Sequence, residues 1–306
     1  MSRALLICGA TGKQGGAVIA NLLKEKTNFE FLAVTRNANS PSAQALLAKS
    51  PEKIKLVQGD LDNPTALFQA AQALTPNVPI HGVFSVQAAI GSNAELSQGK
   101  ALIDAAVAAK VTHFVYSSVD RHGADSPNTP TDIPHFRNKH LIEQHLIAKT
   151  AGTATTWTIL RPVAFMENLT DNFFGRVFAT SWKMAVKDKP LQLVAVSDIG
   201  FFGAQAFLKP EEYAGRGVSL AGDELTIEQA VKVMKEKTGC EMGWANRLFC
   251  SVLMWSMKDF GLMFKWFYDV GYGADIQALR KVNPGMKDFG TWLETESDFR
   301  KGKGGK

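Results

Sequence analysis

Apolar and polar positions alternate through the first half of the chain with two different periods. Short apolar runs predict buried strands, and apolar residues spaced three and four apart between them predict amphipathic helices. The predicted strands are 4–7, 31–34, 54–58, 81–86, 114–118 and 157–162, and the predicted helices are 17–23, 42–49, 63–73, 94–110 and 135–149. Strands that alternate with helices are typical of an α/β fold with a doubly wound parallel sheet, of the Rossmann type.

After residue 162 the pattern becomes less regular. Residues 191–200 predict a strand that leads into a helix through Ala206, and Thr226 with Gln229 predicts a capped helix that ends near Thr238. We therefore expect a Rossmann domain over residues 1–160 and a smaller, mostly α C-terminal domain over 161–306. The main sheet is expected to take strands from 190–200.

Methionine and aromatic side chains are frequent in the last third of the chain. They could line an apolar pocket over a cofactor, because these residues fill irregular spaces, or they could form the core of the smaller domain or a dimer face. The set comprises Phe249, Met254, Trp255, Met257, Phe260, Met263, Phe264, Trp266 and Phe267.

Three glycines occupy the turn between the first predicted strand and the first predicted helix. Gly9, Gly12 and Gly15 give the spacing G-x-x-G-x-x-G. Glycine there permits a sharp bend, a close approach of the backbone to a pyrophosphate, and tight packing of helix on strand. The amides and dipole of the first helical turn then face the phosphates. A plain turn is the alternative, but the strand–turn–helix context predicts a dinucleotide site.

The second predicted strand ends at Thr35-Arg36-Asn37. An acidic residue at the end of this strand binds the ribose 2′-hydroxyl of NAD, whereas the guanidinium of Arg36 can bind a 2′-phosphate through paired hydrogen bonds. Lys13 would add a second positive charge. The sequence therefore favours NADP(H), with NAD(H) as a weaker ligand, and a solvated Arg36 is the alternative.

Ligands of doubly wound sheets bind at the carboxyl ends of the strands. The residues that follow the predicted strands are therefore candidates for contacts with the adenine, ribose, pyrophosphate and nicotinamide. Together with the glycine turn they make up the predicted cofactor-binding set, which is Gly9, Thr11, Gly12, Lys13, Gln14, Gly15, Arg36, Asn37, Asp60, Leu61, Ser85, Val86, Gln87, Lys139, Pro162, Phe165 and Asn168.

His135 and Lys139 are the candidate catalytic residues. They lie four residues apart in a predicted helix and so share a face. Short-chain dehydrogenases carry tyrosine and lysine at this spacing, and the lysine binds the nicotinamide ribose and lowers the pKa of the proton-donating tyrosine. This chain keeps the lysine and has histidine instead of tyrosine. Histidine is an acid near neutral pH, and a capping or surface role for His135 is equally open.

Composition narrows the functional classes. The chain has 306 residues with a net charge of +5, and no basic run interleaved with aromatic residues, so direct nucleic-acid binding is not expected. Three cysteines, without a disulfide framework, favour a reducing compartment. The apolar stretch 248–270 carries too many charges for a membrane span, and neither a leader segment nor a metal site is indicated. We expect a cytoplasmic protein, with nuclear access left open, and a disordered tail at 301–306.

With these residues located, the chain resembles NmrA-like proteins, an atypical branch of the short-chain dehydrogenase/reductase superfamily. The resemblance rests on the glycine turn and on segments 34–37, 58–60, 98–100, 135–139, 161–169, 196–200, 283–284 and 292–294. It implies a Rossmann domain, a smaller C-terminal domain and a cleft between them. It also implies cofactor binding at Gly9, Thr11, Gly12, Gln14, Gly15, Arg36 and Lys139.

The resemblance leads to two functional expectations. Family members without the tyrosine are often described as dinucleotide sensors, which implies an NADP(H)-binding, redox-responsive regulator with little or no dehydrogenase activity and a regulatory protein partner. The alternative is an NADPH-dependent reductase of an apolar carbonyl, quinone or enone compound, with Lys139 and His135 near the nicotinamide. The sequence leaves the substrate, the partner and a homodimer open.

Overall fold

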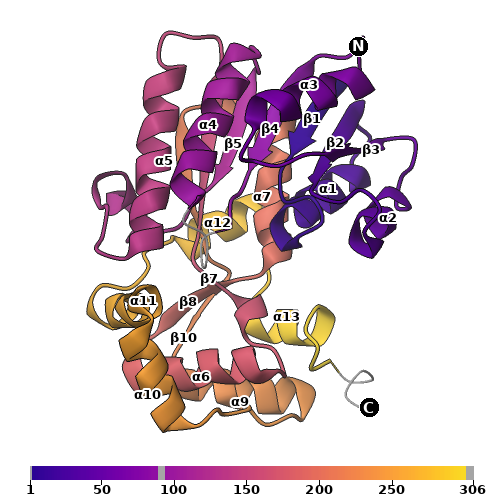
Figure 1. Cartoon of the computed structure of the whole chain (residues 1–306). Coiled ribbons are helices and arrows are strands. Elements are labelled where there is room, and N and C mark those ends of the chain that lie inside the picture. Colours follow the sequence, from indigo (N-terminus) through magenta and orange to yellow (C-terminus); the bar gives the residue numbers. More distant parts are fainter. Residues whose placement is uncertain (1, 89–93, 301–306) are drawn as a thin grey trace. The chain divides into compact units, whose positions relative to one another are not determined.

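The computed structural model describes residues 2–88 and 94–300 (Figure 1). They divide into two compact units, the first formed by residues 2–88, 94–118, 138–160 and 199–218 and the second by 119–137, 161–198 and 219–300. Each unit is therefore assembled from separate stretches of chain, whereas the sequence pattern predicts one boundary near residue 160. The predicted tail at 301–306 lies outside the described residues.

The main sheet has seven strands in the order β3-β2-β1-β4-β5-β6-β9. These are β1 Arg3–Ile7, β2 Phe29–Thr35, β3 Ile54–Gln58, β4 Ile80–Ser85, β5 His113–Ser117, β6 Thr156–Pro162 and β9 Arg216–Leu220. The ladders that join β3 through β6 are parallel. The strand order reverses between β1 and β4, which is the switch point where doubly wound sheets bind ligands. The predicted Rossmann-type fold is confirmed.

Helices cover both faces of this sheet (Figure 1). They are α1 Lys13–Lys24, α2 Pro41–Leu47, α3 Pro64–Leu74, α4 Glu95–Ala108, α5 Pro134–Thr150, α7 Val196–Leu208 and α8 Pro210–Tyr213. On one face, α3, α4 and α5 share a core with alternate strand residues such as Leu6 and Cys8. On the other face, Leu5 of β1 and Phe207 of α7 both lie beside Gly82. Successive side chains along β1 point to opposite faces of the sheet, and helices cover both faces. Every residue from Leu5 to Cys8 is therefore buried.

The second unit contains a small sheet in the order β10-β8-β7. Its strands are β7 Ala164–Phe165, β8 Leu191–Val194 and β10 Asp223–Leu225, and β8 pairs parallel with β7 and antiparallel with β10. The prediction that residues 190–200 contribute to the main sheet is therefore wrong. The seventh strand of the main sheet is β9. The prediction fails because an apolar run shows that a strand is buried but not which neighbour it pairs with.

Five helices of the second unit pack around an aromatic core. They are α6 Phe173–Ala185, α9 Ile227–Thr238, α10 Arg247–Ser256, α11 Lys258–Asp269 and α13 Phe289–Thr295. The unit also contains α12 Ile276–Val282. Phe264, Trp266 and Phe267 of the methionine- and aromatic-rich set are buried in this core. Trp255 and Met257, by contrast, are exposed. Most of this set therefore supplies the unit's own core, which is one of the alternatives that the sequence leaves open.

Candidate cofactor site

The turn between β1 and α1 is shaped by two of its glycines. Gly9 has a φ of +62°, where a side chain is strained, and a Cβ there would lie 2.8 Å from Val86 Cγ1. At Gly15, a Cβ would lie 2.5 Å from the carbonyl oxygen of Gly9. The backbone of α1 thus approaches the turn as closely as glycine permits, as the spacing of the motif predicts.

The first turn of α1 is open to a ligand. Its N-cap residue is Gly12, which has no side chain to bond the first amides. Most other helices carry such a cap, from Ser40, Asn63, Asn172, Thr226, Asn246, Asp275 and Asp288. Thr11, Gly12 and Lys13 are exposed. Amides at a helix start that no side chain caps, together with the helix dipole, suit a phosphate group.

The loop after β2 presents a cation at the same edge of the sheet. Arg36 is exposed, and among the described residues its side chain has no hydrogen bond or ion pair. The loop itself is ordered by Asn37, whose Oδ1 accepts from the amide of Asn39 at 2.9 Å and whose amide donates to Thr35 Oγ1 at 3.3 Å. The guanidinium is therefore available to an anionic ligand on a defined backbone.

Polar side chains at the ends of β3, β4 and β5 contact their own loops and the glycine turn. Ser117 Oγ donates to Gln14 Oε1 at 2.5 Å, which ties the end of β5 to the start of α1. Gln87 Nε2 donates to Ser85 Oγ at 2.9 Å. Gln87 Oε1 is buried and accepts no hydrogen bond from the described part of the chain. After β3, the carboxylate of Asp60 accepts from the amide of Asp62 at 3.0 Å, and the adjoining Leu61 is half-buried.

Lys139 lies on α5 in the first unit and is buried. Its Nζ is 3.0 Å from Oε1 of Glu95, a fully buried carboxylate at the start of α4. The same ammonium is 5.9 Å from the centroid of the Tyr116 ring on β5. Lys139 is thus held by a carboxylate and an aromatic face. No spacing in the sequence indicates that Glu95 or Tyr116 contacts Lys139.

His135 belongs to the second unit, where Asp259 of α11 holds its imidazole. Its Nδ1 lies 2.7 Å from Asp259 Oδ1, and its amide donates to the same oxygen at 3.2 Å. The ring also packs edge-on against Phe136, with 4.7 Å between centroids. Asp259 is 124 residues away along the chain, and the sequence pattern contains no signal for this pair.

The three remaining candidates are also residues of the second unit. Pro162 is buried at the end of β6, Phe165 is half-buried in β7, and Asn168 is exposed at the end of a 3₁₀ helix over Met166–Asn168. Their role in cofactor binding stays a prediction.

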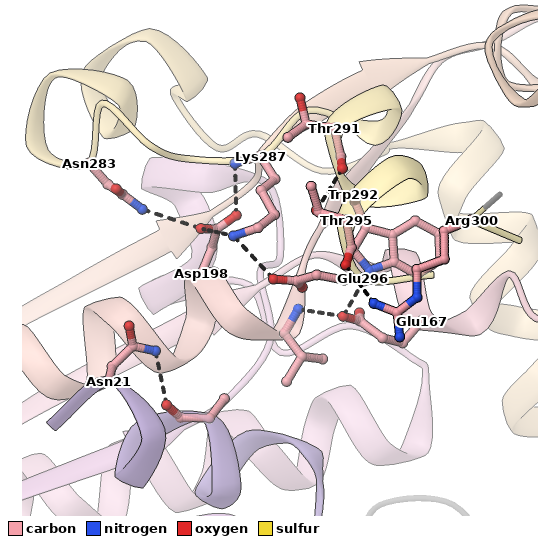
Figure 2. Close-up of polar contacts among 12 residues, drawn as sticks. Asn21, Glu167, Asp198, Asn283, Lys287, Thr291, Trp292, Thr295, Glu296 and Arg300 are labelled. Atoms are coloured by element: carbon pink, nitrogen blue, oxygen red, sulfur yellow. Dashed lines mark hydrogen bonds and ion pairs between the residues drawn. The ribbon is translucent and has the colours of Figure 1, made fainter. Parts of the chain in front are cut away.

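Glu167 and Asp198, by contrast, have structural partners within the second unit (Figure 2). Glu167 Oε1 accepts from the amide of Val196 at 2.9 Å and from Trp292 Nε1 at 3.2 Å. Asp198 accepts from the amide of Lys287 at 2.9 Å, and burial raises the pKa of this carboxyl. Segments 196–200 and 292–294 carry part of the resemblance. Glu167 therefore links them, because it accepts from Val196 at the start of α7 and from Trp292 near the C-terminus.

Other kinds of site find little support. The part of the chain that the structure describes contains no group of three or more His, Cys, Asp or Glu side chains able to hold a metal ion. None of its helices is long and apolar enough to cross a membrane. A cavity of about 900 Å³, lined by Arg3, Phe29 and Phe207 among others, lies at the amino ends of the strands. This is the opposite edge of the sheet from the glycine turn, so the cavity is not the dinucleotide site.

Comparison with known proteins identifies the family. The model of the NmrA-like family matches residues 1–285. The chain belongs to the NmrA-like family. Among curated relatives, an NmrA-like family domain-containing oxidoreductase, lnbB of Aspergillus flavus, is 28% identical over 244 residues, which cover 75% of this chain and 72% of that protein.

Solved structures of NmrA-like and related proteins share the fold. NADPH-dependent quinone oxidoreductase QOR2 of Escherichia coli, complexed with NADPH, superposes with a TM-score of 0.71 and 21% identity, covering 94% of this chain and 96% of its own. NmrA, described as a negative transcriptional regulator and solved in complex with NADP, gives a TM-score of 0.69 and 16% identity, with 97% and 95% coverage. The NmrA-like fold thus occurs in proteins described as enzymes and as regulators.

Proposed function

We propose that this NmrA-like protein binds NADP(H), through the Gly9–Gly15 turn and Arg36. The observation that carries this proposal is the first turn of α1, which has no side-chain cap, behind the glycine turn, with the Arg36 guanidinium exposed on the neighbouring loop and without an ion pair to any described residue. Amides at a helix start bind a pyrophosphate, and a guanidinium binds a 2′-phosphate. The complexes of QOR2 with NADPH and of NmrA with NADP and with NAD add support.

Replacement of Arg36 by serine tests the choice of nucleotide. Loss of charge-assisted hydrogen bonds to the 2′-phosphate should weaken NADPH binding by about ten- to a hundredfold and leave NADH binding within about threefold, as measured by calorimetry. Lys26→Ser is a matched control, because Lys26 is also an exposed cation but borders the cavity at the amino ends of the strands. Equal losses for NADPH and NADH would contradict the role of Arg36.

The same site supports a reductase of an apolar carbonyl, quinone or enone compound. NADPH supplies a hydride when bound, and the protein's part is to orient it and to exclude water. Lys139 would hold the nicotinamide ribose, and its ammonium would be the proton source for the substrate. Its ion pair with Glu95 and the oxidoreductase descriptions of lnbB and QOR2 favour this function.

A screen of quinones and enones for NADPH oxidation tests the reductase. We expect turnover that falls about a hundredfold or more in Lys139→Met, with the protein still folded. Turnover that survives the substitution would remove Lys139 from the mechanism. His135→Gln serves as a second probe, since it removes an acid that Asp259 holds in place.

A second candidate function is a dinucleotide-responsive regulator in the cytoplasm, acting through a protein partner. It is favoured by His135, which stands where short-chain dehydrogenases have their tyrosine and is bonded to Asp259. A regulator needs different affinities for NADP+ and NADPH in its two conformations, because a ligand shifts an equilibrium only by differential binding. Equal dissociation constants for the two forms, together with detectable turnover, would favour the reductase instead.

A further inference from the structure

The first residue of α4, Glu95, is an unusual buried acid. Its side chain has no exposed surface, which is rare for glutamate. Oε1 lies 3.0 Å from Lys139 Nζ, and the two groups form an ion pair. Neither carboxylate oxygen accepts a hydrogen bond from residues 2–88 or 94–300. Within the described part of the chain, this ion pair therefore lacks the further hydrogen bonds that normally offset burial of a carboxylate.

Such a pair is a poor device for stability. Removal of a carboxylate from water is costly, and the attraction of one ammonium offsets that cost only when further hydrogen bonds satisfy the remaining oxygens. Apolar side chains of similar volume would stabilise the junction of α4 and α5 at least as well. The arrangement instead fixes a positive charge at one place in the first unit, and this points to a functional reason.

We propose that Glu95 is a positioning residue for Lys139, holding its ammonium charged and in place to bind the hydroxyls of the nicotinamide ribose. The inference rests on the proposed binding of NADP(H). Because an ammonium has three N–H groups and Glu95 faces it with one oxygen at 3.0 Å, Lys139 retains N–H groups that can donate to ligand oxygens. Glu95 itself would touch neither cofactor nor substrate.

The neighbours of Lys139 support this assignment. Tyr116 of β5 offers its ring face, and Glu143, one turn further along α5, accepts a short hydrogen bond from Ser118 Oγ. His135, one turn before Lys139, is bonded to Asp259. Glu95, with its oxygen 3.0 Å from Nζ, is thus a carboxylate in direct contact with the ammonium.

The two helices also fix the distance between the charges. Gly99 of α4 packs against Ile142 of α5 so closely that a Cβ on Gly99 would lie 2.5 Å from Ile142 Cδ1. Glu95 is one turn before Gly99, and Lys139 is three residues before Ile142. Tight packing at this point leaves the ion pair little freedom to separate.

Glu95→Gln tests the proposal because it keeps the shape and removes the charge. In the wild type, NADPH affinity measured by calorimetry should vary less than threefold between pH 6.5 and pH 9. In the variant it should fall by about tenfold over that range, because burial disfavours an ammonium without a counter-ion. Asp104→Asn is the control: it removes an acid from the same helix, in an exposed pair with His145 and Lys149, and should leave the profile flat.

The outcomes separate this inference from the proposed function. If the wild type does not bind NADPH at all, the proposed function fails and this inference with it. If the wild type binds but Glu95→Gln keeps both the affinity and the flat profile, only the role of Glu95 is overturned. Should Glu95→Gln not fold, Glu95→Asp decides: its shorter carboxylate should keep the profile flat while weakening NADPH several-fold, and an unchanged affinity would contradict the proposal.

Discussion

Gly15 is the residue at which the candidate site tolerates least change. Its Cα faces the carbonyl oxygens of Cys8 and Gly9, and a methyl group would lie within 2.6 Å of both. These two carbonyl groups belong to the backbone and cannot move aside as the end of a flexible side chain would. The position therefore couples the start of α1 to the end of β1.

Gly15→Ala should consequently affect folding and binding together. We expect a loss of about 2 kcal/mol in the free energy of unfolding, from overpacking against backbone, and a loss of NADPH binding as α1 shifts away from the turn. Gly152→Ala is the control, since Gly152 has a φ of +73° but open space around it. It should cost about 1 kcal/mol from backbone strain alone and leave NADPH affinity unchanged. Equal binding losses in the two variants would contradict the account of the turn.

His113 provides a second test at the scale of one residue. The ring is buried in β5, with Nδ1 2.7 Å from Thr156 Oγ1 and Nε2 3.0 Å from Thr158 Oγ1. Burial, aided by the nearby His81, lowers the pKa of His113 to about 4. The unfolded chain binds the proton near the ordinary value of 6.5, so stability is complete above that pH and is lost as the pH falls toward 4.

Urea unfolding at pH 7 and pH 5 measures this contribution. Between these two values the wild type should lose about 2 kcal/mol more than His113→Gln, which cannot take up a proton. His145→Gln is a suitable comparison because His145 pairs with Asp104 near the surface. Parallel pH profiles for the wild type and His113→Gln would show that the buried ring does not govern acid stability.

Among the elements, α9 is the one that local sequence determines most completely. Thr226 Oγ1 accepts from the amide of Gln229, and Gln229 Oε1 accepts from the amide of Thr226. Gly239 ends the helix with a φ of +76°. The cap and the helix end near Thr238 are predicted from the sequence, because capping depends on residues within one turn of each other.

Thr226→Ala should lower the free energy of unfolding by about 1 kcal/mol, because the amide of Gln229 at the start of α9 loses the hydroxyl oxygen that accepts its hydrogen bond. Thr291→Ala is the matched variant. Thr291 lies in the first turn of α13, and its amide donates to Asp288, so the cap of this helix comes from Asp288 and not from the Thr291 side chain. It should change stability by less than about 0.5 kcal/mol. Both values come from urea titration, and a Thr226→Ala cost no greater than that of Thr291→Ala would refute the cap.

What the sequence could not predict are the partners that tertiary structure brings together. Hydrophobic periodicity located β8 as a strand but could not assign its neighbours, since β7 and β10 are only two and three residues long. The glycine turn and Arg36 can be predicted from the sequence, because the residues that signal them lie close together in the chain. The contacts of Lys139 with Glu95 and of His135 with Asp259 were not, because no spacing rule links residues so far apart in the chain.

At the scale of the whole molecule, the second unit depends on a junction between distant segments. Lys287 Nζ lies 3.7 Å from Asp198 and 3.3 Å from Glu296, while the amide of Lys287 donates to Asp198 (Figure 2). Asn283 Nδ2 donates to the same carboxylate at 3.3 Å. The C-terminal residues are thus bonded to the beginning of α7 by one buried acid.

Lys287→Met should leave Asp198 without its ammonium and lower the free energy of unfolding by about 2 kcal/mol. Lys235→Met removes the lysine of an exposed pair with Glu241 and should cost less than about 0.5 kcal/mol. Thermal unfolding of both variants provides the comparison. Similar midpoints for the two would mean that the junction adds nothing to the second unit beyond backbone contacts.

A crystal structure of the protein with NADPH would show whether the glycine turn and Arg36 bind a 2′-phosphorylated dinucleotide. We expect the pyrophosphate on the first-turn amides of α1, the 2′-phosphate on the Arg36 guanidinium, and the nicotinamide ribose on Lys139. Density for the nucleotide elsewhere, or a 2′-phosphate that projects into solvent away from Arg36, would contradict it.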